Sequence, residues 1–244
     1  MKFKYGWKPD RPDHRDLLYQ SIQPTIPLPL KVDLTLQCSP VENQGSLGSC
    51  TANALVGNLE FLELKNQQPF IDMSRLFIYY NERLIEGTVK YDAGASLRDG
   101  IKSLAKAGCC SEKDWAYEIS RFTRKPSLKC YLEARRHKIT SYFSLNNQRE
   151  LLTCLADGYP FVFGFSVYES FESERVAKTG IAPMPSPNEQ NLGGHAVMAV
   201  GYDSTKNVFI VRNSWGASWG MKGYFTLPFR YVNELANDFW TIRR

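Results

Sequence analysis

The chain has 244 residues, of which 43% are hydrophobic and 13% aromatic, and its formal net charge at pH 7 is +5. This composition supports one large domain or two small lobes that share a cleft, and it excludes a disordered chain. Basic residues are scattered and not interleaved with aromatics, so we expect no nucleic-acid partner. No apolar run is long enough for a membrane span or an N-terminal signal peptide, which predicts a protein that is cytoplasmic or exported without the general secretory (Sec) route.

Residues 1–30 are predicted to form an extended arm. Five prolines interrupt any helical pattern in this segment: Pro9, Pro12, Pro24, Pro27 and Pro29. Three alternatives follow for this arm: it covers a cleft or lobe junction as a short propeptide-like segment, it packs elsewhere, or it is disordered. The candidate anchors are Tyr5, Trp7 and Tyr19.

Helices dominate the next part of the chain, which we assign to a helical lobe over 31–138. Apolar periodicity and capping residues predict helices at 50–65, 74–83, 96–106 and about 126–136. The first carries Cys50 in its first turn, the second has Ser74 as its N-cap, and the third ends before Gly108.

Strand-like runs dominate the rest, which we assign to a β lobe over 139–244. They are bounded by turns and lie at 161–167, 196–202, 208–211 and 223–227. A hairpin loop at 203–207 joins two of them, and a helix at 150–156 is the exception. The predicted fold class is therefore α+β, with two lobes of different structure.

Six cysteines need an explanation. They are Cys38, Cys50, Cys109, Cys110, Cys130 and Cys154. No CxxC pair or Cys/His spacing suggests zinc, so we expect no metal. If one is a free nucleophile, the other five cannot all pair, and a mostly reduced protein is expected; one bridge from Cys38 to Cys109 or Cys110 is the alternative.

Cys50 follows a Gly/Ser-rich turn and begins a predicted helix, where the helix dipole favours a thiolate. A nucleophilic thiol also needs a base. Among the three histidines, His14 lies in the polar arm and His137 in a basic run, whereas His195 follows a Gly-Gly turn at the start of an apolar strand. His195 is therefore the predicted partner of Cys50.

Two amides complete the predicted site. Asn213 follows His195 by 18 residues and can accept the second ring N–H, and Trp215 would shield that bond from water. Gln44 precedes Cys50 by six residues and, with the Cys50 backbone N–H, offers donors to the negative charge on an attacked carbonyl. These residue types in this order predict a cysteine-nucleophile hydrolase.

The motifs resemble those of papain-like cysteine proteases of the papain/cathepsin (C1) family. They are Gln-Gly-Ser-x-Gly-Ser-Cys at 44–50, Gly-His-Ala-Val at 194–197 and Asn-Ser-Trp-Gly-x-x-Trp-Gly-x-x-Gly-Tyr at 213–224. The resemblance covers about residues 31–240. It implies a two-lobed fold with a helical left lobe, an antiparallel β-barrel right lobe and the active-site cleft between them. It also implies peptide hydrolysis through a thioester acyl-enzyme.

Two departures from the family pattern are informative. Leu47 stands where the family usually has cysteine, and Thr51 where it usually has an aromatic, so the usual left-lobe disulfide from that cysteine is absent. The variant at 47–54, together with Gly-Trp-x-Pro-Asp-x-Pro-Asp-x-Arg-Asp at 6–16, resembles a bacterial branch of the family.

The resemblance also implies where a substrate binds. Residues 92–96 match the stretch that usually pairs its backbone with an extended substrate, and Gly94 lacks a Cβ that would hinder close approach. The expected substrate-binding residues are Gly94, Ala95, Gly194 and Trp215. Gly164 is a weaker candidate for the wall opposite Gly94.

We expect a monomeric peptidase that acts on peptides or proteins without a cofactor, a metal or a membrane partner. Two alternatives stay open: a thiol-dependent acyltransferase or deamidase that uses the same nucleophile, and a catalytically silent papain-like scaffold that binds a partner. The complete set of Cys50, His195, Asn213 and Gln44 argues against the scaffold, because a silent scaffold needs none of them.

Overall fold

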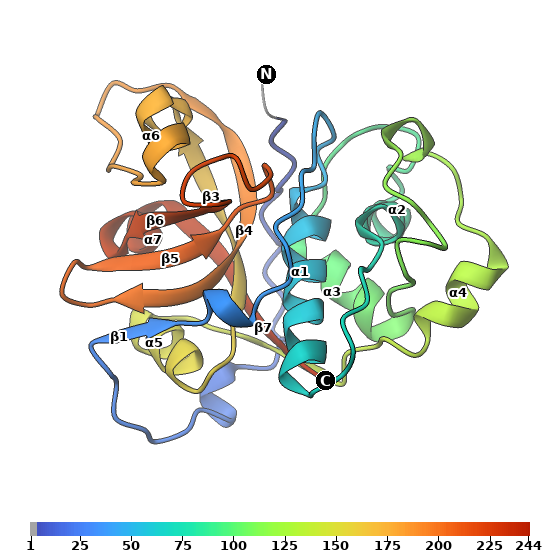
Figure 1. Ribbon diagram of the computed structural model, residues 1–244, viewed down its shortest axis with the longest axis horizontal. Helices are drawn as coiled ribbons and strands as arrows, with labels where there is room; N and C mark the ends of the chain where they lie inside the picture. Colours follow the sequence, from blue (N-terminus) through green and yellow to red (C-terminus); the bar gives the residue numbers. More distant parts are fainter. Residues whose placement is uncertain (1–3) are drawn as a thin grey trace.

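The computed structural model describes residues 4–244, so the first three residues of the predicted arm lie outside the described part. The chain forms a helical half and a sheet half, with α1 (Cys50–Lys65) along their junction (Figure 1). The N-terminal arm, in dark blue, passes between the two halves. Within the described residues, no helix is both long and apolar enough to cross a bilayer.

The helical half consists of α1, α2 (Arg75–Glu86), α3 (Leu97–Lys106) and α4 (Leu128–Ala134). The side chain of Ser74 accepts a hydrogen bond from the Phe77 N–H and caps α2, and Ser96 caps α3 in the same way. The first fourteen residues of α1 are all buried, because α2 and α3 pack on one side of it and β4 on another.

The sheet half contains seven antiparallel strands in the order β2-β7-β3-β4-β5-β6, with β1 paired to β4. Their bounds are β1 (Lys31–Asp33), β2 (Ser141–Ser144), β3 (Phe161–Tyr168), β4 (Asn191–Asp203), β5 (Val208–Arg212), β6 (Tyr224–Pro228) and β7 (Ala236–Arg243). Three helices complete it: α5 (Gln148–Ala156), α6 (Glu174–Thr179) and α7 (Phe229–Leu235). Short 3-10 helices lie at Tyr19–Ser21, Thr35–Gln37, Ile119–Arg121 and Glu169–Glu172. The predicted α+β, two-lobed class is confirmed.

The structure corrects three expectations. Residues 31–33, which open the predicted helical lobe, form β1 and pair with β4, so this segment belongs to the sheet half. Strands β2 and β7 and helices α6 and α7 were not predicted. All six cysteines lie within residues 4–244 and all are free thiols, so the alternative bridge from Cys38 to Cys109 or Cys110 is wrong.

Candidate active site

The candidate nucleophile, Cys50, is the first residue of α1 and is fully buried. Gln44, at the start of the preceding turn, is held by the sheet half. Its backbone N–H donates to the Ser214 carbonyl (2.8 Å), and its Oε1 accepts from the Ser214 hydroxyl (2.6 Å). Because Oε1 is the acceptor, Nε2 is the donating atom of this amide, as an oxyanion donor must be, and one of its N–H groups is bonded to the Leu47 carbonyl (2.9 Å).

The candidate base lies on the other side of the junction. His195 is in β4 and Asn213 directly follows β5, and the antiparallel pairing of these strands brings the two side chains together. His195 Nε2 and Asn213 Oδ1 are 2.8 Å apart, and the same oxygen accepts from the Ser214 N–H (2.9 Å). An oxygen that only accepts places the imidazole proton on Nε2, so Nδ1 is the basic nitrogen.

An aromatic shell surrounds this pair. The Trp215 ring stacks on the His195 imidazole, with ring centroids 4.9 Å apart and planes at 25°. Phe165 contacts the same imidazole edge-on at 5.8 Å. His195 and Asn213 are both buried, so their hydrogen bond is protected from competition with water.

Burial keeps both reactive groups uncharged in this state. Burial raises the pKa of the Cys50 thiol to about 11, against smaller opposing effects of backbone hydrogen bonds from Ala196 and Gly6. Burial lowers the pKa of His195 to about 4, although the hydrogen bond with Asn213 favours the charged form. Within the described residues, Nδ1 of His195 has no hydrogen-bond partner. Both shifts favour a neutral thiol and a neutral imidazole over an ion pair while the site is buried.

The backbone of the N-terminal arm is hydrogen-bonded to both halves at this site. The Trp7 N–H donates to the Gly194 carbonyl (3.0 Å), and the Lys8 N–H donates to the Ala95 carbonyl (3.0 Å). The Ala95 N–H donates to the Gly6 carbonyl (2.8 Å), which makes a parallel bridge between Trp7 and Ala95. Residues 4–8 thus join the helical half to the sheet half across the site.

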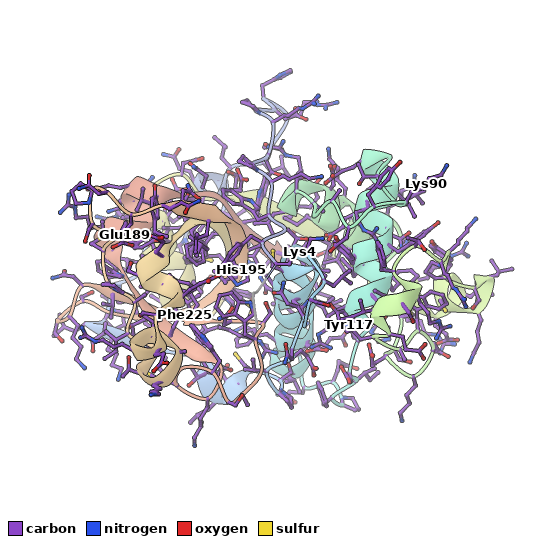
Figure 2. The ribbon with its side chains drawn as sticks, turned by 90° about the horizontal axis from the view of Figure 1, so that it is seen from above. Lys4, Lys90, Tyr117, Glu189, His195 and Phe225 are labelled. Atoms are coloured by element: carbon purple, nitrogen blue, oxygen red, sulfur yellow. The ribbon has the colours of Figure 1, made fainter. Side chains whose placement is uncertain are left out.

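The start of the described arm lies against the candidate catalytic groups. Figure 2 labels Lys4 and His195 at the junction of the two halves. Gln44 Nε2 donates to the Lys4 carbonyl (3.2 Å), so the candidate oxyanion donor is engaged by the arm. The Tyr5 ring lies edge-on to His195, with centroids 6.0 Å apart, and also contacts Trp215.

The four predicted substrate-binding residues all face the arm. Gly94 has φ +67°, and a Cβ there would overlap the Gly6 carbonyl. A Cβ at Gly194 would lie 2.5 Å from the Trp7 ring. Ala95 pairs with the arm backbone and Trp215 with Tyr5, as described above. The arm therefore contacts all four of these residues.

Charged residues that sequence reasoning missed anchor the arm. Lys4 forms an ion pair with Asp92 (2.5 Å), and Lys8 forms one with Glu86 (2.7 Å). The Tyr5 hydroxyl donates to Glu172, and the Trp7 indole N–H donates to Asp238 (3.1 Å). Their acidic partners come from a loop, α2, a 3-10 helix and β7, so no motif marks them. The third predicted anchor, Tyr19, is buried elsewhere, near Cys154.

The family model of papain family cysteine proteases matches residues 28–236. The chain belongs to this family. The solved structure of xylellain, a cysteine protease from Xylella fastidiosa, is 45% identical and matches with a TM-score of 0.91, over 98% of this chain and 95% of that one.

Two more distant relatives support the same family assignment. A peptidase C1-like protein of Acanthamoeba polyphaga mimivirus is 40% identical, in a match that covers 98% of this chain and 86% of that protein. Bovine pro-cathepsin H is 28% identical over 78% of this chain, and the match spans 56% of pro-cathepsin H. The predicted family and the predicted class of papain-like cysteine peptidase are confirmed.

Proposed function

We propose that this papain-family peptidase cleaves peptide bonds through a thioester at Cys50, and that residues 4–8 hold it in a covered resting state. The contact between His195 Nε2 and Asn213 Oδ1 at 2.8 Å supports the first part, because it leaves Nδ1 as the basic nitrogen of a ring that Tyr5 of the arm contacts. The backbone hydrogen bonds of the arm to Gly194 and Ala95 support the second part, the covered resting state.

The proposed reaction begins when the arm leaves. The Cys50 thiol gives its proton to Nδ1 of His195, and the thiolate attacks the carbonyl carbon of the substrate. The oxygen becomes negatively charged and accepts hydrogen bonds from Gln44 Nε2 and the Cys50 backbone N–H. His195 then protonates the leaving amine as the C–N bond breaks, and a thioester remains. Water attacks the thioester with His195 as base, the C–S bond breaks and the thiol is restored.

Arm and substrate compete for the same groups in this proposal. The Lys4 carbonyl takes the Gln44 donor that the oxyanion needs, and residues 6–8 take the backbone groups of Ala95 and Gly194. Burial of Cys50 also raises the pKa of its thiol to about 11, which disfavours the thiolate at pH 7. The covered chain is therefore expected to be nearly inactive.

The test compares hydrolysis of a denatured protein by four full-length chains. The wild type is expected to be slow, and Trp7→Ala faster because it removes the buried anchor of the arm, whose side chain is 8% exposed. Leu17→Ala, also in the arm but 55% exposed, is the matched control and should behave as wild type. Trp7→Ala with Cys50→Ala should be inactive. Equal rates for the first three would contradict the cover, and activity without Cys50 would contradict the mechanism.

The alternative of acyl transfer uses the same nucleophile and is separated by products. The Trp7→Ala chain is incubated with a peptide substrate and an added primary amine, and the products are read by mass spectrometry. Hydrolysis predicts free carboxylates as the main product. Predominant amide formation with the added amine would favour the acyltransferase.

A further inference from the structure

A groove of about 550 Å³ lies on the surface of the helical half, where the ends of α2 and α3 meet α4 and the segment before it. Figure 1 shows α4, in yellow-green, at the end of the helical half that is far from the sheet half, whereas α1 lies along the junction. None of the described arm residues and none of the candidate catalytic residues lines this groove. The groove is therefore distinct from the candidate active site.

Apolar side chains at the end of α2 are exposed in this groove, although the same helix buries those at its start. Leu76 and Phe77, in the first turn of α2, are fully buried. Leu84 and Ile85, in its last turn, line the groove and are each about half exposed. Leu128, the first residue of α4, also lines it and is 74% exposed. Apolar side chains that gather on one surface with polar groups around them are typical of sites that bind another molecule.

Contacts between α2 and α4 fix the walls of the groove. The Tyr131 hydroxyl of α4 donates to Asn81 Oδ1 of α2 (2.9 Å), and the Tyr131 ring contacts Phe77, with ring centroids 5.0 Å apart. The side chain of Ser127 caps α4, so the helix that carries Leu128 begins at a defined residue. A groove that is already formed loses little conformational entropy when it is filled.

The charged side chains that line the groove are all basic. They are Lys106 at the end of α3, Lys125 before α4 and Arg135 at the end of α4. All three are exposed, and none forms an ion pair within residues 4–244. The neighbouring Lys129, which does not line the groove, is paired with Asp114 (2.6 Å). The groove thus combines an apolar surface with three cations that have no acidic partner in the described chain.

We infer that this groove binds a segment of a partner protein that carries apolar side chains on one face of a helix and carboxylates beside them. Such a segment complements both the apolar surface and the three cations. A groove between helices accommodates the apolar face of an amphipathic helix, whereas a bilayer presents a flat surface. A second copy of this chain is disfavoured as the occupant, because it brings the same cations and a net charge of +5. The inference goes beyond the proposed function and does not depend on it.

The test measures the binding of two labelled synthetic peptides to the full-length Cys50→Ala chain by fluorescence anisotropy. The Cys50→Ala substitution prevents cleavage of the probes under the proposed mechanism. Both peptides are amphipathic helices with the same leucines, and they carry glutamates beside the leucines in one and lysines in the other. The acidic peptide should bind at least about tenfold more tightly than the basic one, and its binding should weaken as the salt concentration rises.

Further substitutions in the same chain locate the binding. Lys106→Glu with Arg135→Glu should weaken binding of the acidic peptide by about tenfold or more, because two attractive charges become repulsive. Lys90→Glu is the matched control, since Lys90, labelled in Figure 2, is exposed and does not line the groove. Leu128→Ser should weaken binding by about tenfold, because it removes apolar surface that the peptide buries. Leu36→Ser, at a 99% exposed leucine outside the groove, should leave binding unchanged.

Three results would overturn the inference: no binding of the acidic peptide, equal weakening by Lys90→Glu, or unchanged binding in Leu128→Ser. The last would leave only a general attraction between charges. If the double charge reversal prevents folding, as measured by circular dichroism, Lys106→Gln with Arg135→Gln decides, since it removes both charges without reversing them. Phosphatidylserine vesicles provide the final comparison. Vesicle binding that needs Lys106 and Arg135, without any binding of the acidic peptide, would assign this surface to an anionic membrane instead.

Discussion

The two halves of the molecule hold their parts of the site in different ways. The helical half presents Cys50 at a helix start, on a helix that is buried on all sides. The sheet half holds His195 and Asn213 on adjacent strands, under a shell of rings that includes Trp215 and Phe165. The helical half thus fixes one atom by backbone position, whereas the sheet half fixes an orientation by side-chain contacts.

Because of this difference, substitutions in the two halves should affect turnover in different ways. In the proposed mechanism, loss of the thiol removes a reacting atom, for which no neighbouring group substitutes. Loss of a supporting group in the sheet half leaves the base present but less well oriented. We therefore expect loss of Cys50 in the helical half to abolish turnover, and loss of Asn213, which supports the base in the sheet half, to reduce turnover only in part.

The largest effect is expected for Cys50→Ala in the Trp7→Ala chain. Turnover of a peptide substrate should fall by about a thousandfold or more, because the nucleophile and base act as a unit. Cys38→Ala is the matched control, since Cys38 is a partly exposed free thiol outside the site. Comparable activity in the Cys50→Ala and Cys38→Ala chains would mean that the helical half does not supply the nucleophile.

A stability prediction contrasts a buried with an exposed ion pair. Arg75 in α2 binds Glu60 of α1 (2.9 Å), and both side chains are buried. Arg75→Met leaves that carboxylate buried without its cation and should cost about 3 kcal/mol in the free energy of unfolding by urea. Arg230→Met breaks an exposed pair with Glu234 in the sheet half and should cost about 0.5 kcal/mol or less. Similar costs would contradict the contrast.

The smallest catalytic effect is expected for Asn213→Ala. The base remains but its ring loses the acceptor at Nε2, so kcat in the Trp7→Ala chain should fall by about ten- to a hundredfold with little change in KM. Asn213→Asp, which keeps an acceptor oxygen, should retain more activity than Asn213→Ala. A loss as large as that for Cys50→Ala would mean that the sheet half supplies more than orientation.

The same contrast explains what the sequence predicts well. Helix α1 begins at Cys50 and ends at Lys65 as predicted, and Ser74 and Ser96 cap α2 and α3, because caps and apolar periodicity are local signals. Strand β7 was missed because it lies between β2 and β3, whose residues are far from it in the chain. Its stability depends on partners that no local pattern identifies.

The residues of the candidate site also divide into those that the sequence identifies and those that it does not. Motif and chain order identify Cys50, His195, Asn213 and Gln44, and the structure brings Gln44 and Asn213 to the two sides of Ser214. Asp238, which accepts the hydrogen bond of the Trp7 indole, carries no such signal, because the direction of its side chain depends on a bulge in β7 and a left-handed backbone. The Lys4 carbonyl is a backbone group, so the identity of residue 4 says nothing of its contact with Gln44.

The most direct test of the central claim measures the rate at which an epoxysuccinyl thiol probe labels Cys50 as a function of pH. It compares the full-length wild type with Gly6→Ala, whose methyl group would overlap the Gly48 carbonyl and displace the arm. Because burial raises the thiol pKa to about 11, wild-type labelling should be slow at pH 7 and rise only at alkaline pH. Gly6→Ala should label at least tenfold faster at pH 7, with its rise shifted to lower pH. Equal labelling rates and equal pH profiles in the two chains would contradict a papain-family site held at rest by its own N-terminal arm.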